Sequence, residues 1–102
     1  MPNLRPLDLR LLRGLVRPID VLAAMAWTPT TRERASIRGP CPIHGSRSRF
    51  SRSLSVADRW WRCHSCGAHG DALELYRLIH RKPVLEAAYE LCDLLAIDPP
   101  YL

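Results

Sequence analysis

Four potential metal ligands occur as two pairs in the middle of the 102-residue sequence. Two residues separate Cys41 from His44, and two residues separate Cys63 from Cys66. Structural zinc is held by four nitrogen or sulfur ligands at tetrahedral corners, and two ligands three positions apart on a tight turn can reach one ion together. We therefore predict that these four residues share one Zn²⁺. Four protein ligands close the coordination sphere, so the predicted ion is structural and not catalytic.

Other uses of these residue types fit the sequence less well. A thioredoxin-like Cys-x-x-Cys motif requires a βαβ context, and a zinc deaminase requires a glutamate near its ligands, whereas His44 is followed by Gly and Ser. His64 and His69 are rival ligands beside the second pair. We predict that His64 points outward and that His69 hydrogen-bonds the backbone or contacts phosphate. Cys92, on an apolar stripe far downstream, is predicted to be a core residue.

Basic charge is concentrated around the two pairs. The formal net charge is +5, but residues 32–62 contain eight arginines and two acids, whereas residues 71–98 contain six acids and three bases. Arginine makes bidentate contacts to phosphate, so this segment indicates a polyanionic partner. A solvated surface without a partner would have the same composition.

A hairpin is predicted between the two ligand pairs. "SLSVA" has the alternation of a half-buried strand, and "WWRC" follows it after a turn. Because Cys63 must face the zinc, alternation places Trp61 on the inner side and sends Trp60 and Arg62 outward. An exposed tryptophan beside an arginine can stack an unpaired base and pair with phosphate, although Trp60 could instead pack on the first helix. The predicted nucleic-acid contacts are Arg47, Arg49, Arg52, Arg59, Trp60 and Arg62.

Helices are predicted on both sides of the hairpin. Leucine spacing predicts an amphipathic helix over residues 7–16, and Pro18 suits the first turn of a second helix that runs to about residue 27. Downstream, Asp71 and Glu74 form a start signal that resembles a capping box, and a last helix follows Pro83. The predicted fold class is α+β, a small zinc ribbon made of an antiparallel hairpin with two zinc knuckles, flanked by N-terminal and C-terminal helices.

Hydropathy and the cysteine pattern indicate a cytoplasmic protein. The sequence has no run of about 18 apolar residues, and its N-terminus lacks the apolar core and cleavage site of a signal peptide. Four cysteines in such a protein favour metal binding over disulfides.

Taken together, the motifs resemble the N-terminal zinc-binding domain of bacterial-type (DnaG-type) DNA primases. The similar segments are CPIH, SLSV, WWRCHSCGAHGDALEL and LEAAYELCDLLAI, within residues 18–98. Residues 1–17 are then an additional amphipathic segment of one predicted domain, residues 1–102. The resemblance implies a zinc ribbon on a small antiparallel sheet that binds single-stranded template DNA, with the same four ligands. Ile43 departs from the aromatic residue usual in the family, and "GSRSRFSRS" is more basic than the corresponding turn.

The resemblance does not extend to catalysis. In primases a polymerase core follows the zinc domain, and nucleotide polymerisation requires clustered carboxylates for Mg²⁺. Here the sequence ends at Leu102, and the acids of the C-terminal helices are scattered. We expect a non-enzymatic protein that binds single-stranded or exposed DNA for a replication or mobile-element system, with a polymerase or helicase as a separate partner. The alternative is an adaptor whose Arg/Leu-rich N-terminal helix and acidic C-terminal helices dock onto a partner protein.

Overall fold

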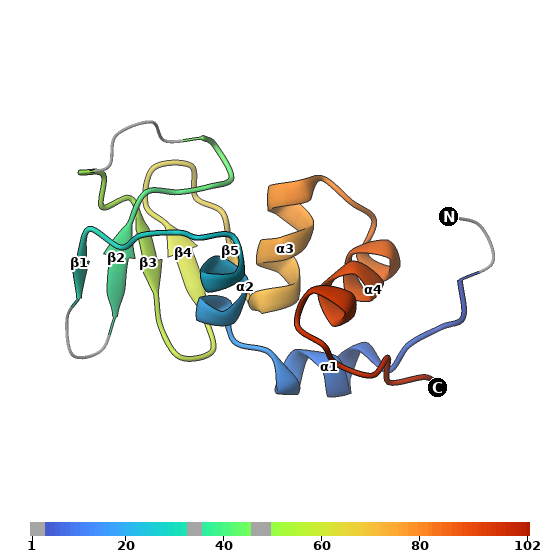
Figure 1. The fold of residues 1–102 in the computed structure, drawn as a ribbon. Coiled ribbons are helices and arrows are strands. Elements are labelled where there is room, and N and C mark those ends of the chain that lie inside the picture. The colour runs from blue at the N-terminus through green and yellow to red at the C-terminus, as the bar shows by residue number, and fades with distance from the viewer. Residues whose placement is uncertain (1–3, 33–35, 46–49) are drawn as a thin grey trace.

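A five-stranded antiparallel sheet and four helices make up the described part of the chain, which in this computed structural model comprises residues 4–32, 36–45 and 50–102. Figure 1 shows the sheet at one end of the molecule, α4 at the other and α3 between them. The elements are, in chain order, α1 (Leu9–Leu15), α2 (Pro18–Ala24), β1 (Thr31–Arg32), β2 (Ile37–Gly39), β3 (Leu54–Val56), β4 (Trp61–Cys63), β5 (His69–Gly70), α3 (Ala72–His80) and α4 (Val84–Leu94).

The sheet is built around the predicted hairpin, which is β3–β4. The strands lie in sequence order, and each pairs antiparallel with its neighbour. The Ala57 amide donates to the Trp60 carbonyl at 2.7 Å, which closes the turn between β3 and β4. The predicted α+β zinc-ribbon fold is confirmed. The two-residue strands β1 and β5 were not predicted, because segments this short have no readable alternation and form only by pairing with neighbours.

Alternation along the strands buries one face of the sheet. Leu54, Val56, Trp61 and Cys63 are all buried, whereas Arg62, between the last two, is exposed. The buried face joins one apolar core with α2, α3 and α4, whose inward side chains include Leu22, Leu75 and Leu91.

The helices α2, α3 and α4 begin as their sequence signals predict, whereas α1 begins at Leu9 with Asp8 as its N-cap and not at residue 7. The helix α2 ends earlier than expected. Its last helical residue is Ala24, because Ala26 takes a positive φ of 57° and the Trp27 amide folds back to the Leu22 carbonyl at 3.0 Å. At the start of α3, an Asp71 carboxylate oxygen accepts the Glu74 amide at 3.0 Å. The Glu74 carboxylate pairs with Arg77 on the same helix.

The N-terminal segment packs on the rest of the molecule through α1. The Asp8 amide donates to the Pro100 carbonyl at 2.7 Å, and Arg13 forms a 2.6 Å ion pair with Asp71 at the start of α3. Leu12 is fully buried between these contacts. In the part of the chain that the structure describes, no helix has both the length and the hydropathy needed to cross a membrane.

Replacing Gly39 by alanine is expected to destabilise the fold by about 1–3 kcal/mol, the usual cost of overpacking. A Cβ at this position in β2 would overlap the ring of Trp27. That ring cannot move without cost, because its Nε1 donates to the Pro40 carbonyl at 2.7 Å. Urea unfolding of the zinc-loaded protein measures the effect.

Gly14 in α1 provides the matched control for this substitution. A Cβ there would meet no atom within 4 Å, so Gly14→Ala is expected to stabilise the helix by about 0.5–1 kcal/mol. A Gly39→Ala protein as stable as the wild type would contradict the tight packing between β2 and Trp27.

Candidate metal centre and outer sheet face

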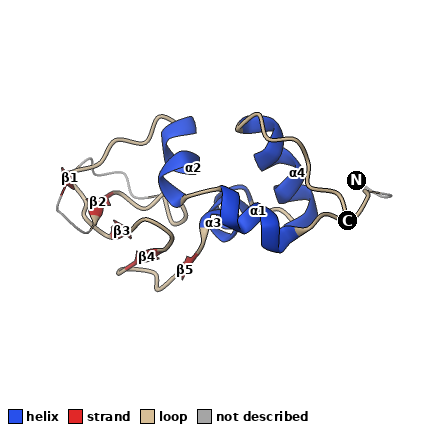
Figure 2. Cartoon of the chain, turned by 90° about the horizontal axis from the view of Figure 1, so that it is seen from below, coloured by secondary structure: helices blue, strands red, loops and turns tan. Residues whose placement is uncertain are grey.

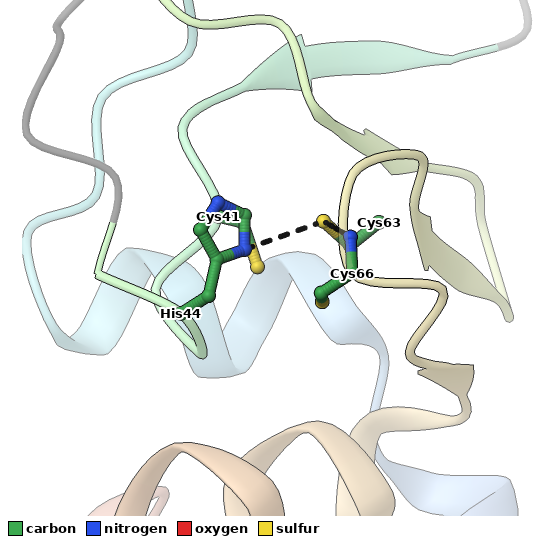
Figure 3. A group of neighbouring side chains, drawn as sticks. All are labelled: Cys41, His44, Cys63 and Cys66. Atoms are coloured by element: carbon green, nitrogen blue, oxygen red, sulfur yellow. Dashed lines mark hydrogen bonds between the residues drawn. The ribbon is translucent and has the colours of Figure 1, made fainter.

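Two tight turns present the four predicted ligands. Cys41 lies just after β2, and the turn that carries His44 ends at Gly45, whose φ is 69°. Cys63 is the last residue of β4, and the turn through Cys66 closes when the Gly67 amide donates to the Cys63 carbonyl at 2.9 Å. Gly67 has a φ of 79°, which suits glycine. Figure 3 shows the two turns facing each other.

The separations between the donor atoms fit one zinc ion. The three sulfur atoms and one ring nitrogen all lie within 4.8 Å of one another. His44 Nδ1 lies 3.5 Å from Cys63 Sγ (Figure 3), and zinc–ligand bonds of ~2.0–2.3 Å at a tetrahedral angle place sulfur and nitrogen about 3.6 Å apart. Cys41 and Cys63 are buried, whereas His44 and Cys66 reach the surface. A zinc ion bound here would supply structural cross-linking between β2 and β4.

Backbone amides already prepare one sulfur to carry negative charge. Burial disfavours the Cys63 thiolate, but hydrogen bonds from the Cys66 backbone and side chain, the Ser65 backbone and the Cys41 side chain together outweigh it and lower the pKa of Cys63 to about 7. One of these is the Cys66 amide, 3.4 Å from Cys63 Sγ. Burial instead raises the pKa of the Cys41 thiol to about 12, against opposing hydrogen bonds from the His44 and Ile43 backbone. Zn²⁺ binds cysteine as the thiolate, so loading this site would release protons from these thiols.

The outer face of the sheet carries a row of polar side chains in register. Arg38 pairs with Ser55, Ser55 with Arg62, and Arg62 with His69, so the row crosses β2, β3, β4 and β5. Because alternate residues point to opposite faces, this row lies on the side of the sheet away from Trp61 and Cys63. The Arg38 guanidinium donates to the Arg52 carbonyl at 2.9 Å through Nε.

Trp60 and His69 form an aromatic hollow at the β5 end of this row. Trp60 is 53% exposed, and its ring centroid lies 5.9 Å from that of His69. The hollow has a volume of about 350 Å³ and is lined by Trp60, Arg62, Gly67 and His69. His69 Nδ1 donates to the Gly67 carbonyl at 3.1 Å, which orients the imidazole. An exposed aromatic surface thus lies next to a guanidinium group.

The structure divides the predicted nucleic-acid contacts into different environments. Trp60 and Arg62 meet at the hollow. Arg59 instead turns toward α1, where its guanidinium donates to the Gly14 carbonyl at 3.0 Å. Arg52 is exposed just before β3. Two further predicted contacts lie outside the described residues, namely Arg47 and Arg49.

The remaining sequence interpretations can be placed as well. Trp61 is 1% exposed, and its Nε1 donates to the Asp71 carbonyl at 2.7 Å. Cys92 is buried in the core, and His64 is exposed. His69 hydrogen-bonds the backbone, which is the first of the two roles predicted for it.

The sequence prediction left Arg38 out of the nucleic-acid contacts and named His69 only as a residue that hydrogen-bonds the backbone or contacts phosphate. Their place on the outer face follows from their pairing with the β3–β4 hairpin. The outward position of Arg62 could have indicated them, because residues paired across neighbouring strands point to the same face of a sheet. That signal could not be used without knowing that β2 and β5 flank the hairpin.

Comparison with protein families identifies the chain. The model of the CHC2 zinc finger, a DnaG-type zinc ribbon, matches residues 16–102, a segment that contains all four clustered ligands and begins just after α1. No match was found among curated proteins. The chain therefore belongs to the CHC2 zinc finger family, and Cys41, His44, Cys63 and Cys66 form a compact zinc site of the kind that defines it.

Proposed function

We propose that this protein binds single-stranded or otherwise unpaired DNA on the outer face of its sheet. In this proposal it serves a replication or mobile-element system in which a separate polypeptide, such as a polymerase or helicase, supplies catalysis. The observation that carries the proposal is the exposed hollow where Trp60, Arg62 and His69 meet. Membership of a zinc finger family of primases supports the same class of ligand.

The chemistry of the hollow suits an unpaired nucleotide. Every base has a π face that can stack on an exposed indole, and such stacking contributes about 1–3 kcal/mol per base. The Arg62 guanidinium, on the same surface, can pair with a backbone phosphate. A base inside a duplex is already stacked, so this surface should favour single strands over blunt duplexes.

The metal site supports the proposal because it would fix the position of β4, the strand that carries Arg62. Cys63 and Arg62 are neighbours on β4 but point to opposite faces, so zinc would hold the strand from one side and leave the other side free. Ordering β4 before binding reduces the entropy cost of forming the complex. We also propose that residues 1–102 act as one domain, which the contacts of α1 with Pro100 and Asp71 support.

Titration of a fluorescent single-stranded oligonucleotide at two salt concentrations tests the proposal. Affinity should fall as salt rises, with a slope of about −0.7 for each phosphate contact, and Arg62→Gln should remove about one such contact. Trp60→Ala should weaken binding by about 1–3 kcal/mol with little change in the salt slope. A blunt duplex of the same length should bind less tightly.

The control is Arg81→Gln, which removes the same charge from an exposed arginine at the far end of α3. It should leave the affinity close to that of the wild type. Binding that does not respond to salt, or that is weakened equally by Arg81→Gln and Arg62→Gln, would rule out the proposed surface.

A further inference from the structure

A solvent-open hollow lies in the helical half of the molecule, away from the zinc site. It has a volume of about 590 Å³ and is lined by Leu15, Asp20, Ala23, Ala24, Leu95 and Ile97. These residues come from the end of α1, from α2 and from the turn after α4. In Figure 2, α2 and α4 stand apart with α1 between them. The hollow is open to solvent, and apolar side chains line it together with the Asp20 carboxylate.

A ridge of leucines borders this hollow. Leu11 and Leu15, one helical turn apart on α1, are 51% and 55% exposed. Gly14, beside them, has no atom within 4 Å of the position where a Cβ would stand, so another backbone could approach closely. Both leucines precede residue 16, where the match to the zinc finger family begins. The ridge is thus an addition of this chain to the family domain.

Charges of opposite sign flank the ridge and the hollow. Arg10 is exposed on α1, Asp93 is exposed in the last turn of α4, and Asp98 is exposed in the segment after that helix. Both aspartates line a second hollow of about 440 Å³ that shares Ile97 with the first. Among the described residues, none of these three side chains takes part in an ion pair with another side chain. A basic side chain therefore stands beside the ridge, and two acidic side chains stand close to Ile97, which the two hollows share.

We propose that this face binds a second copy of the chain, with the Leu11–Leu15 ridge of each copy in the hollow of the other. A ridge and a complementary hollow side by side on one surface are self-complementary, and a two-fold axis near Leu15 brings each ridge onto the opposite hollow. Arg10 of one copy then faces Asp93 and Asp98 of the other. This dimer does not depend on the proposed DNA binding, because the outer sheet face takes no part in it.

Sedimentation equilibrium of the zinc-loaded, reduced full chain over a range of concentrations tests the proposal. The wild type should show a concentration-dependent dimer. The double variant Leu11→Gln, Leu15→Gln should be monomeric, with unchanged circular dichroism and zinc content because both side chains are exposed. Phe50→Gln, which removes a 71% exposed apolar side chain from the other half of the molecule, should leave the association unchanged.

A charge exchange distinguishes this dimer from nonspecific association of leucines. Arg10→Glu should weaken association by about tenfold, and adding Asp98→Arg should restore most of it. A wild type that stays monomeric at every concentration overturns the proposal, as does a dimer that survives the double leucine substitution. A monomer that binds a synthetic peptide of residues 7–17 overturns it too, and would indicate a partner protein with a basic, leucine-rich helix.

Discussion

Removal of zinc with a strong chelator is expected to unfold the sheet half of this protein. Cys41 and Cys63 are 1% and 0% exposed and belong to the same core as Leu54 and Trp61. The strands have only two or three residues each, and at this end of the sheet β2 and β4 are joined only through the short strand β3, by the pairs Gly39–Leu54 and Leu54–Cys63. Zinc would add a direct link between the residues that follow β2 and the end of β4. Structural zinc sites contribute about 10–16 kcal/mol, which is comparable to the entire stability of a small domain, about 5–15 kcal/mol.

Two cysteine substitutions separate loss of the metal from loss of a buried sulfur. Cys63→Ser should abolish stoichiometric zinc binding and the cooperative thermal transition followed by circular dichroism. Cys92→Ala removes an equally buried thiol that lies outside the ligand cluster. It should retain one zinc per chain and lose only about 1–2 kcal/mol of stability.

Metal analysis supplies the decisive readout for this prediction. A purified wild type that carries no stoichiometric zinc and yet melts cooperatively would contradict a structural zinc site. So would a chelated protein with the melting temperature of the untreated one.

Substitution of Trp61 by alanine should destabilise the protein by about 3–5 kcal/mol, the range for deletion of a large buried aromatic. The side chain is 1% exposed between the sheet and α3. Its Nε1 donates to the carbonyl of Asp71, the residue that caps α3, at 2.7 Å. The alanine variant therefore leaves a cavity and also removes a hydrogen bond that ties β4 to the start of α3.

The neighbouring tryptophan is the matched control. Trp60 is 53% exposed, so Trp60→Ala should change the free energy of unfolding by about 0.5 kcal/mol or less. Urea unfolding of both variants with zinc bound measures the contrast, and Trp61→Phe should fall between them. If the two alanine variants lost similar stability, the assignment of one tryptophan to the core and the other to the surface would be wrong.

Local chemistry explains why much of this arrangement could be predicted. The ligand spacing required a shared metal, because residues three apart on a tight turn can converge on one ion. Once Cys63 was assigned to the metal, alternation along β4 placed Trp61 inside and Arg62 outside, and the structure shows both positions. The start of α3 was also readable, since Asp71 caps the helix through its own side chain.

Interactions between distant segments could not be read in this way. The two-residue strand β5 exists only because it pairs with β4, and that pairing places His69 beside Trp60 and Arg62. The same limit applies to Arg59. The basic composition of its segment grouped this residue with the nucleic-acid contacts, but its guanidinium donates a hydrogen bond to the carbonyl of Gly14, 45 positions away in the chain.

The sequence alone therefore determined the zinc ligands, the hairpin between them and the inner and outer sides of β4. Each of these follows from spacings of a few residues, over which backbone geometry is known in advance. Only the tertiary structure decided which residues from β2, β4 and β5 share the outer face, and that α1 exposes its leucines beside a hollow formed by α2 and the end of α4. Those neighbours depend on how the elements pack, and packing is set by the whole core rather than by any short segment.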